Sequence, residues 1–590
     1  MPRRFLTLRE AVEAVLQDSD SDEDSTKATD ICILPPVDGR QSETEDIDED
    51  NLEPEEPGDV CGEIEVFTSE DSEPPAAATT DTASSAAASV GAKRRKRGSG
   101  PKKAKKSKVV KNKWTTRETY DSIIAEGVLQ PVANTNPELI AKSPIELFEL
   151  IWNHEIISLI VEQSELYARR DLNQSTFSTT DDEIRQFIGI LMLTGYNCQP
   201  CEKDYWSTSC DLGCDLVTST MSRNRFLELK RCLHLADNQH LQTTKMAKVA
   251  PIYDLLNKNL LQFGIFHDQL SVDESMVPYY GHHGAKMFIR GKPIRFGFKI
   301  WMLCGVDGYP YQAAIYSGKT DRPEGVGLGE HVVLSFANLI PDKSCHKLFF
   351  DNFFSSYDLL VRLKNMGLRA TGTVREGRIG GAPLKDKKSF AKKERGKFEY
   401  VGSGVVTAVR WSDNNVVTCI TNFDTVTPEK DIQRCVKGKE GKSVVKQPRM
   451  IANYTSGMGG VDLMDRLLST YRPRVKGRKW WWNLFINALN VASVAAWRLH
   501  CSVSHPAIVK THLEFLRELV QALTRSCSPR VRLGGPTAPT PNCVRFDGVH
   551  HYLEKTSQGR CVFCTRNTTK KCSKCDKRLH EKCFEQYHTK

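Results

Sequence analysis

The spacing of hydrophobic and polar positions changes along this chain, and the change divides it into regions of different secondary structure. Between residues 114 and 260, apolar residues recur at helical spacing, over 144–160 and again after the capping sequence 180–183. From residue 268 onward they occur in short strand-like runs, at 269–276, 298–306, 311–316 and 347–350. The pattern therefore predicts a helical region followed by a sheet.

The order of the predicted elements is informative. Asp307 and Gly308, a dipeptide typical of tight hairpins, join the second run to the third. After the fourth run, residues 355–365 are predicted to form a helix that stops at Gly367, and 369–374 a further strand. Three strands followed by a strand–helix–strand unit are the order that a ribonuclease-H-like α/β core requires.

Three further regions follow the core strands. Residues 398–401, 405–411 and 416–420 are predicted to form a small β-meander, which interrupts the core as an insertion. Helices are predicted at 458–470 and 484–499. The predicted domains are an N-terminal tail (1–112), a helical region (113–267), the first part of the core (268–394), the β-insertion (395–450), the last part of the core with its helices (451–533), a linker (534–547) and a cysteine-rich domain (548–590).

Charge is unevenly distributed, although the net charge is only +9. Residues 1–17 are predicted to form a short amphipathic helix, whereas 18–90, with its acidic runs, is too charged to build a core and is expected to be disordered. Basic clusters at 93–97 and 102–108 are typical of nuclear import or of non-specific DNA contact, with a solvated linker as the alternative. We therefore expect a nuclear protein that binds an import receptor.

Composition narrows the class of protein. A chain of 590 residues with 39% hydrophobic residues can form several domains with sizeable cores. No apolar stretch of membrane-spanning length occurs and the first residues lack a secretory signal, so neither a membrane protein nor a secreted one is expected. The 19 cysteines then favour free thiols and metal ligation over a disulfide framework. The basic body favours nucleic acid as the partner.

Acidic residues occupy three separate places that suit a metal site. Asp273 lies in the first predicted strand of the core, Asp351 ends an apolar run, and Asp462 and Asp465 lie three residues apart on one face of a predicted helix. A carboxylate at the end of a buried strand is costly without a cation or partner. Two Mg²⁺ (or Mn²⁺) ions held by carboxylates support in-line attack on a phosphodiester. For any single Asp, a cap or turn role is the commoner alternative.

The segments around these acids resemble the piggyBac transposase family. The similar segments are 272–281 with 288–299, 350–356 and 459–465, and the resemblance extends from about residue 140 to the C-terminus. It implies a multidomain α/β protein, with a ribonuclease-H-like catalytic core, an inserted β-domain and flanking helices that dimerise and hold DNA. It also implies that Asp273, Asp351 and Asp462 are the catalytic, metal-binding carboxylates, with Asp465 close to the site.

The reaction implied by the resemblance is cut-and-paste transposition by a three-aspartate transposase. The element end is nicked, the freed 3′-OH forms a hairpin that is reopened, and the 3′-OH joins a TTAA target. The implied partners are double-stranded DNA, as terminal repeats and TTAA target, and a second copy of this chain. The alternative is a domesticated, catalytically silent protein that binds DNA or chromatin; the presence of all four aspartates argues against it.

Basic and aromatic residues follow both acidic segments. Basic side chains there would hold the phosphate backbone near the metals. Trp480, with its neighbours Trp481 and Trp482, could stack on unpaired bases, although two of the three could instead pack in the core. His282 and His283 have no predicted role. The predicted DNA-binding residues are Lys286, Arg290, Lys292, Arg295, Lys299, Arg472, Arg474, Lys476, Arg478, Lys479 and Trp480.

The C-terminal tail carries a dense set of zinc ligands, whose pairing predicts a two-zinc, cross-braced module of the RING or PHD kind. One Zn²⁺ would bind Cys561, Cys564, His580 and Cys583, and the other Cys572, Cys575, His588 and either His550 or His551. The resemblance implies that this module binds element-end DNA. A ubiquitin ligase is the third hypothesis, which the lysine-rich segments between the ligands disfavour.

Overall fold

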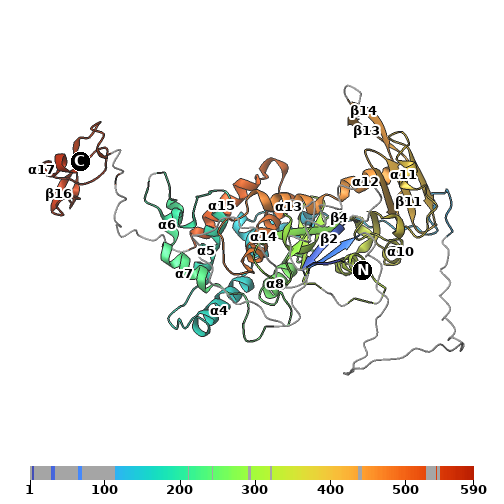
Figure 1. Cartoon of the computed structure of the whole chain (residues 1–590), viewed down its shortest axis with the longest axis horizontal. Coiled ribbons are helices and arrows are strands. Elements are labelled where there is room, and N and C mark those ends of the chain that lie inside the picture. Colours follow the sequence, from blue (N-terminus) through green and yellow to red (C-terminus); the bar gives the residue numbers. More distant parts are fainter. Residues whose placement is uncertain are drawn as a thin grey trace, which may run out of the picture. The chain divides into compact units, whose positions relative to one another are not determined.

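The computed structural model describes residues 113–589, apart from residues 210, 242, 290–293, 319–321, 324, 436–441, 527–539 and 541–544. It also describes three short strands nearer the N-terminus, β1 (Arg3–Phe5), β2 (Ala28–Ile33) and β3 (Ile64–Thr68). Figure 1 labels the helices and strands in chain order. The chain divides into two units. One comprises Met1–Cys198 with Leu227–Cys527, and the other Gln199–Phe226 with Ser528–Lys590.

Five strands form the centre of the larger unit's sheet. They are β4 (Gln269–Pro278), β6 (Phe296–Gly305), β7 (Pro310–Ile315), β8 (Lys347–Phe350) and β9 (Arg369–Thr373). Their order is β7-β6-β4-β8-β9. Strand β6 is antiparallel to β7 and β4, and strand β8 is parallel to β4 and β9. The five predicted strands are thus confirmed, with ends shifted by at most a few residues.

The sheet continues beyond β9. Strand β12 (Val416–Thr421) pairs antiparallel with β9, and β11 (Thr407–Ser412) and β10 (Phe398–Gly402) follow. The predicted meander is therefore confirmed as strands, and it extends the core sheet. Strands β13 (Lys430–Cys435) and β14 (Lys442–Gln447) form a separate hairpin that the sequence pattern did not reveal.

On the other side of the core, β6 pairs with β5 (Met287–Phe288), β5 with β2, β2 with β3, and β3 with β1. The predictions of a helix over 1–17 and of disorder over 18–90 are wrong for the residues in β1, β2 and β3. The apolar, β-branched runs in β2 and β3 provide the reason, because such residues favour strand pairing. The other residues of these two segments lie outside the described part.

Two helices lie on the sheet beside the acidic segments. Helix α12 (Arg449–Gly457) contacts β4, β8, β9 and β12, and α13 (Gly460–Thr470) contacts β4 and β6. Helix α10 (Tyr357–Asn365), which Ser356 caps and Gly367 follows, contacts β9, β12 and α9 (Leu328–Leu339). The helices predicted at 355–365 and 458–470 are thus confirmed.

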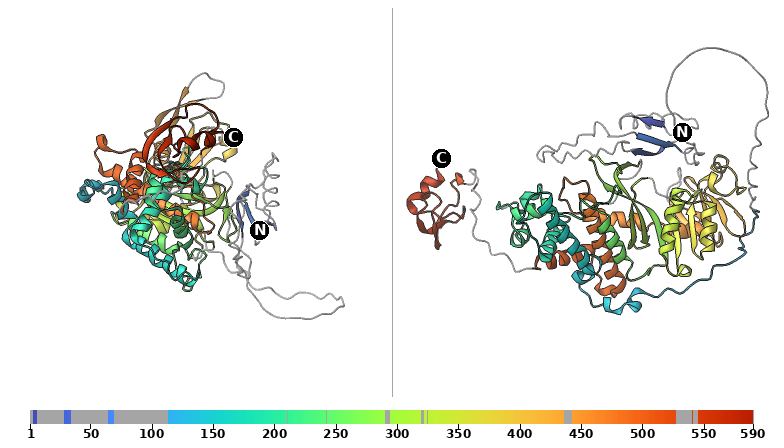
Figure 2. Two further views of the ribbon diagram at one scale, coloured as in Figure 1. Left: turned by 90° about the vertical axis from the view of Figure 1, so that its left-hand side faces the viewer. Right: turned by 90° about the horizontal axis from the view of Figure 1, so that it is seen from below.

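Helices from early and late parts of the sequence pack around α14 (Trp482–Val503), and their differently coloured ribbons lie together in Figure 2. Helix α14 is buried along most of its length. Its helical neighbours are α2 (Val132–Thr135), α3 (Pro144–Ile151), α8 (Ala250–Leu260), α13 and α15 (His512–Thr524). The continuous helix predicted over 144–160 is wrong, since Asn153 caps a separate helix, α4 (His154–Arg170), by accepting from the Ile156 N–H. Thr180 caps α5 (Asp181–Leu193) as predicted.

The remaining elements are short. They include α6 (Asp215–Thr220), α7 (Arg223–Cys232) and α11 (Lys387–Phe390). The cysteine-rich domain consists of the antiparallel pair β15 (Leu553–Arg560) and β16 (Asn567–Cys572) with α17 (Glu581–His588). Among the helices described, none combines the length and the apolar character needed to cross a membrane.

Candidate functional site

Two of the predicted acidic residues lie on neighbouring parallel strands. Asp273 occupies the middle of β4 and is 8% exposed, and Asp351 directly follows β8. The register pairs Ser271 of β4 with Phe349 of β8. Because residues two apart on a strand point to the same face, Asp273 and Asp351 extend from the same face at the same level.

Helix α13 contributes the other two acidic residues. The Ser275 hydroxyl donates a hydrogen bond of 2.5 Å to the Asp465 carboxylate, and Ser275 shares a strand face with Asp273. Asp462, one turn earlier in the first turn of α13, is exposed. Asp465 therefore lies against the strand of Asp273, while Asp462 faces solvent at the start of the helix.

Small residues allow α12 and α13 to approach the sheet this closely. The Ser271 hydroxyl accepts a hydrogen bond of 3.2 Å from the Val461 N–H at the start of α13. A Cβ at Gly460 would collide with the Gly305 carbonyl, and a Cβ at Gly457 with the ring of Phe349. The glycines of this segment therefore determine how near its acidic residues lie to β4 and β8.

Negative charge gathers at this face. Burial raises the pKa of the Cys304 thiol on β6, and the carboxylates of Asp465, Asp307 and Asp273 raise it further. Burial lowers the pKa of the Arg472 guanidinium, and the charge of Asp465 opposes that change. Carboxylate oxygens grouped on one semi-buried face suit a hard divalent cation.

The acidic oxygens do not form a closed cage. In the described part of the chain, groups of three or more potential ligands whose ligand atoms all lie within 4.8 Å of one another consist of Cys and His alone. Mg²⁺ usually takes only one or two protein carboxylates and completes its shell with water and phosphate oxygens. An open arrangement of aspartates therefore fits Mg²⁺ or Mn²⁺ together with a phosphodiester.

Two further acidic residues near the site, Glu274 and Asp307, have structural positions. Glu274 pairs with Trp301 of β6, and the alternation of strand side chains directs it away from the face of Asp273. Asp307 accepts the Tyr309 N–H at 2.8 Å in its turn and lies 3.1 Å from the His267 ring. The sequence did not reveal the contact of Ser275 with Asp465, because a serine within a strand carries no distinguishing pattern.

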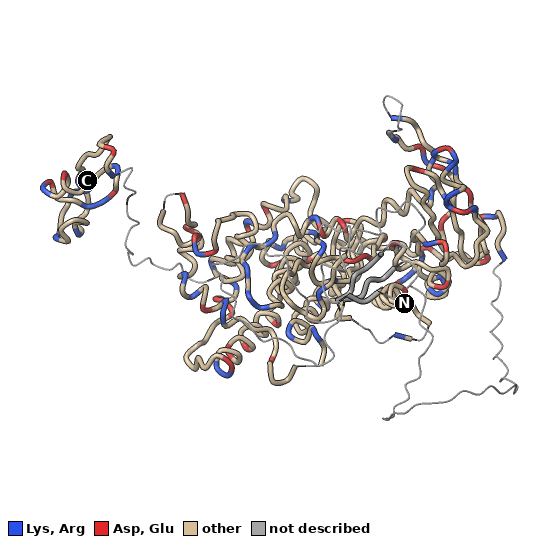
Figure 3. The backbone as a smooth tube through the Cα atoms, viewed as in Figure 1, with Lys and Arg blue, Asp and Glu red and all other residues tan. Residues whose placement is uncertain are grey.

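Lys and Arg residues occur throughout the described chain (Figure 3). The predicted basic residues differ in exposure. Arg295, Arg474, Lys476 and Arg478 are exposed, Arg472 and Lys479 are partly buried, and Arg290 and Lys292 lie outside the described residues.

The surface position expected for Lys286 and Lys299 is wrong. These lysines are 3% and 5% exposed, so neither presents its ammonium group to a phosphate in this structure. The Lys286 ammonium donates to the Tyr280 carbonyl at 3.1 Å, and that of Lys299 lies 4.1 Å from the Trp301 ring.

The three consecutive tryptophans divide as the alternative interpretation predicted. Trp481 and Trp482 are buried in the core, which excludes base stacking by their rings in this structure. Trp480 is partly buried, and its ring stacks on His283 at a centroid distance of 4.1 Å. His283, for which no role was predicted, thus belongs to an aromatic cluster that also includes Phe298.

The cysteine-rich domain brings its ligands together in two groups of four. Cys561, Cys564, His580 and Cys583 form one group, and His551, Cys572, Cys575 and His588 the other, with all ligand atoms of a group within 4.8 Å. This is the predicted pairing, with His551 as the eighth ligand. The groups alternate along the chain, which is the arrangement of a cross-braced module.

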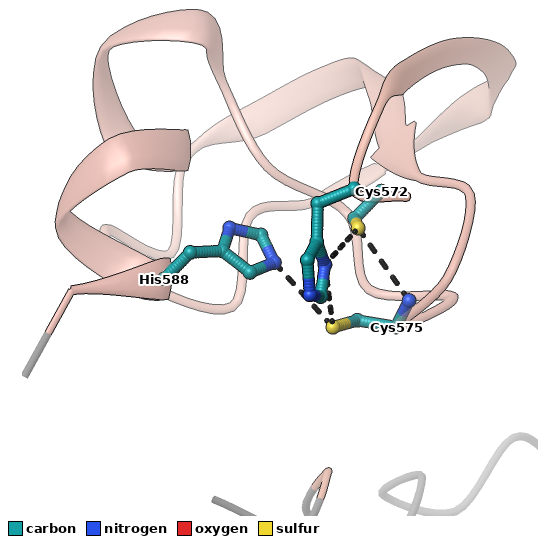
Figure 4. Close-up of side chains that lie close together, drawn as sticks. Cys572, Cys575 and His588 are labelled. Carbon is teal, nitrogen blue, oxygen red and sulfur yellow. Dashed lines mark hydrogen bonds between the residues drawn. The ribbon is translucent and has the colours of Figure 1, made fainter. Parts of the chain in front are cut away.

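The ligand geometry suits zinc in both groups. His551 Nδ1 lies 3.3 Å from Cys572 Sγ, and His588 Nε2 lies 3.4 Å from Cys575 Sγ (Figure 4). The other nitrogen of each ring faces an oxygen atom, Asp547 for His551 at 3.0 Å and the Phe584 carbonyl for His588 at 2.8 Å. Such outer contacts fix the tautomer and orientation of a zinc-ligating histidine.

The first group shows the same features. His580 Nδ1 lies 3.3 Å from Cys564 Sγ, while its Nε2 lies 2.9 Å from the Asn567 carbonyl. Burial raises the pKa of the Cys561 thiol, but hydrogen bonds from backbone N–H groups, beginning with that of Cys564, outweigh burial and lower the pKa to about 6. A thiolate at neutral pH is the form that binds zinc.

Comparison with known proteins gives consistent results. The family described as "Transposase IS4" matches residues 143–497. PiggyBac transposable element-derived protein 3 of Homo sapiens is 36% identical over 480 residues, which cover 79% of this chain and 80% of that protein. PiggyBac transposable element-derived protein 2 of Homo sapiens is 32% identical over 458 residues, 76% of each chain.

A solved structure shares the fold. The cryo-EM structure of a piggyBac transposase synaptic complex with hairpin DNA matches 75% of this chain and 95% of that chain, with a TM-score of 0.57 and 23% sequence identity.

Proposed function

Because this chain belongs to the piggyBac transposase family, we propose that it is a metal-dependent DNA transposase, which excises a DNA element and joins it to TTAA targets. The observations that support the proposal are the register that sets Asp273 of β4 level with Asp351 after β8 and the hydrogen bond between Ser275 and Asp465, which joins α13 to β4. The strand order β7-β6-β4-β8-β9 supports assigning that sheet to a ribonuclease-H-like core.

Each acidic residue has a part in the proposed site. Asp273, Asp351 and Asp462 would hold Mg²⁺ or Mn²⁺, which activates the attacking oxygen and stabilises the leaving oxygen of an in-line displacement. Asp465, through the Ser275 hydroxyl, holds α13 against β4. Asp462, exposed one turn earlier on that helix, would reach the metals from the solvent side. The same site would serve nicking, hairpin formation and joining, without a covalent protein–DNA intermediate.

DNA is the proposed partner. The exposed residues Arg295, Arg474, Lys476 and Arg478 would contact the phosphate backbone. The cysteine-rich module, with two Zn²⁺ ions, would bind the element ends, and the DNA complex in the matched structure supports DNA as the partner. A homodimer would hold two ends together, and the basic clusters near residue 100 would direct the chain to the nucleus.

Excision in cells tests the proposal. A donor element flanked by TTAA, with ends taken from sequence flanking the gene, is combined with the wild-type chain or with Asp351→Asn. We expect excision by the wild type and a loss of at least about 100-fold in the variant, because a neutral amide cannot replace a metal-binding carboxylate. Asp342→Asn, at an exposed helix cap, is the matched control and should retain excision.

The opposite result has a clear meaning. Purified wild-type protein that binds the ends but neither nicks nor excises them, with Mg²⁺ or Mn²⁺ present, would contradict the proposal. It would support the domesticated DNA-binding protein instead.

A further inference from the structure

Tyr454 lies close enough to the acidic residues to sense the charges of Asp351 and Asp273, although its position in the sequence does not suggest this. It lies on α12, eight positions before Asp462, in the segment Ala452–Gly457, which carries no acidic residue. Helix α12 contacts β4, β8 and β9, and Asp273 lies on the first of these strands while Asp351 directly follows the second. The helix therefore packs on both strands that position the two carboxylates.

The packing of α12 brings Tyr454 to the ends of these strands. Gly457, one turn after Tyr454, touches the Phe349 ring, and Phe349 and Asp351 extend from the same side of β8. On β9, which is parallel to β8, the Tyr454 hydroxyl lies 3.4 Å from Thr373 Oγ1. Phe349 pairs with Thr371, so Thr373 extends from this side of the sheet as well.

The charges around the hydroxyl agree with this placement. Burial raises the pKa of Tyr454, the hydrogen bond with Thr373 opposes that rise, and the negative charges of Cys419, Asp351 and Asp273 add to it. A phenol in this environment stays protonated at neutral pH. It can donate a hydrogen bond to an anion without adding charge to the site.

We propose that Tyr454 is a positioning residue of the proposed metal site, whose hydroxyl orients the Asp351 carboxylate toward the cation while Thr373 holds the hydroxyl. The inference rests on the proposed function, because it assigns a further residue to the same metal site. Outer groups that orient a metal ligand typically change metal affinity or activity by about 10–100-fold when they are removed. The effect should therefore appear in metal binding as well as in DNA cleavage.

Mn²⁺ binding to the purified, zinc-loaded full chain tests the proposal without a requirement for activity. Free Mn²⁺ is followed by electron paramagnetic resonance in a titration of the wild type, Asp351→Asn, Tyr454→Phe and Tyr400→Phe. Tyr454→Phe retains the ring that packs against the apolar cluster of Met450 and Ile451. Tyr400 packs against the same cluster from β10, so Tyr400→Phe is a matched control.

We expect Asp351→Asn to lose the tight Mn²⁺ site and Tyr454→Phe to bind Mn²⁺ about 10–100-fold more weakly than the wild type. Tyr400→Phe should match the wild type, and Tm should be equal in all four proteins. Equal Mn²⁺ affinity of Tyr454→Phe and the wild type, with Asp351→Asn still defective, would overturn the role of Tyr454 and leave the proposed function intact. Equal binding by Asp351→Asn and the wild type would overturn the metal site itself.

A second variant, Thr373→Val, tests the same proposal if Tyr454→Phe does not fold. Thr373→Val removes the hydroxyl that holds Tyr454 and changes little in side-chain volume. It should weaken Mn²⁺ binding in the same direction as Tyr454→Phe. Unchanged Mn²⁺ affinity in a folded Thr373→Val protein would then count against the proposal.

Discussion

At the scale of single residues, Gly457 decides whether α12 can reach β8. A methyl group at this position would overlap the ring of Phe349, which is 1% exposed and has no room to move. We expect Gly457→Ala to lower the free energy of unfolding by roughly 1–3 kcal/mol, the usual cost of overpacking a core. A Cβ at Gly459 would meet nothing within 4 Å, so Gly459→Ala is the control, and urea denaturation of both variants measures the difference. Equal stabilities would refute the close packing of α12.

His283 makes stability depend on pH. Its ring stacks on Trp480, and its Nδ1 accepts the Ala285 N–H at 3.2 Å, which a protonated ring cannot do. Burial and then the charge of Lys245 lower its pKa from 6.5 to about 4. Since the unfolded chain binds the proton first as pH falls, the stabilisation is complete above about pH 6.5 and is lost between that value and about pH 4.

A variant without the His283 imidazole should reveal this loss of stability. From pH 7.5 to pH 5, the wild type should lose roughly 1–2 kcal/mol of stability relative to His283→Phe, after allowance for partial solvent access. Thermal melts of the two proteins at several pH values measure the difference. His282→Phe, at the exposed neighbouring position, should follow the wild type across the whole range. A constant gap between His283→Phe and the wild type would show that His283 titrates normally.

At the scale of elements, we expect the cysteine-rich module to depend on bound metal ions for folding. Its buried core consists of Cys561, Cys572, Cys575, Leu579 and Tyr587, so three of the five residues are proposed ligands. A core this small cannot hold β15, β16 and α17 together without bound ions.

Removal of one ligand tests that dependence. We expect Cys561→Ser to reduce the zinc content from two ions per chain to one, and to expose the module to proteolysis and rapid hydrogen exchange. Cys501→Ser, on α14 outside both ligand groups, should retain both ions. Mass spectrometry and elemental analysis follow the two effects. Full protection of the module in a zinc-free protein would contradict the expectation.

The elements predicted correctly are those with a strong local pattern. The core strands are short apolar runs bounded by turn residues, and α14 is a long apolar helix, so each is recognisable alone. Helix α12 was missed because it is short, mixes polar with apolar residues and begins after Pro448 without a capping side chain. The boundary between α3 and α4 was also missed, because the apolar spacing is continuous there and only the cap at Asn153 separates the two helices.

The candidate site shows the same limit of sequence information. Aspartates after apolar strands and paired cysteines carry their chemistry in their spacing, which is why these residues could be chosen. The contact between Ser275 and Asp465 joins positions 190 residues apart, and only the packing of α13 on β4 creates it. The choice between His550 and His551 depends on the backbone, because His550 has a φ of 58° and His551 Nδ1 lies near both Cys572 and Cys575.

At the scale of the whole molecule, the loop between α13 and α14 presents much of the basic charge near the acidic site. The Thr194 hydroxyl accepts the Arg474 N–H at 2.9 Å at one end of the loop. At the other end, the Lys479 ammonium donates to the carbonyls of Arg231 and Leu233 at 2.8 and 2.6 Å. The Arg474 backbone and the Lys479 side chain thus fix the loop, while the side chains of Arg474, Lys476 and Arg478 are exposed.

Such a fixed basic loop should contribute to DNA affinity mainly through counterion release. Each phosphate contact adds about 0.9 to the magnitude of the slope of log K against log salt concentration. We expect the triple variant Arg474→Ala, Lys476→Ala, Arg478→Ala to lower that magnitude by about 2–3 and to weaken binding to all duplex sequences alike. Fluorescence anisotropy with a labelled duplex between 50 and 200 mM salt measures the slope. The double variant Lys258→Ala, Arg517→Ala is the control, because it removes exposed cations on α8 and α15 and should leave the slope unchanged. Equal slopes for the triple variant and the wild type would exclude this loop from the DNA interface.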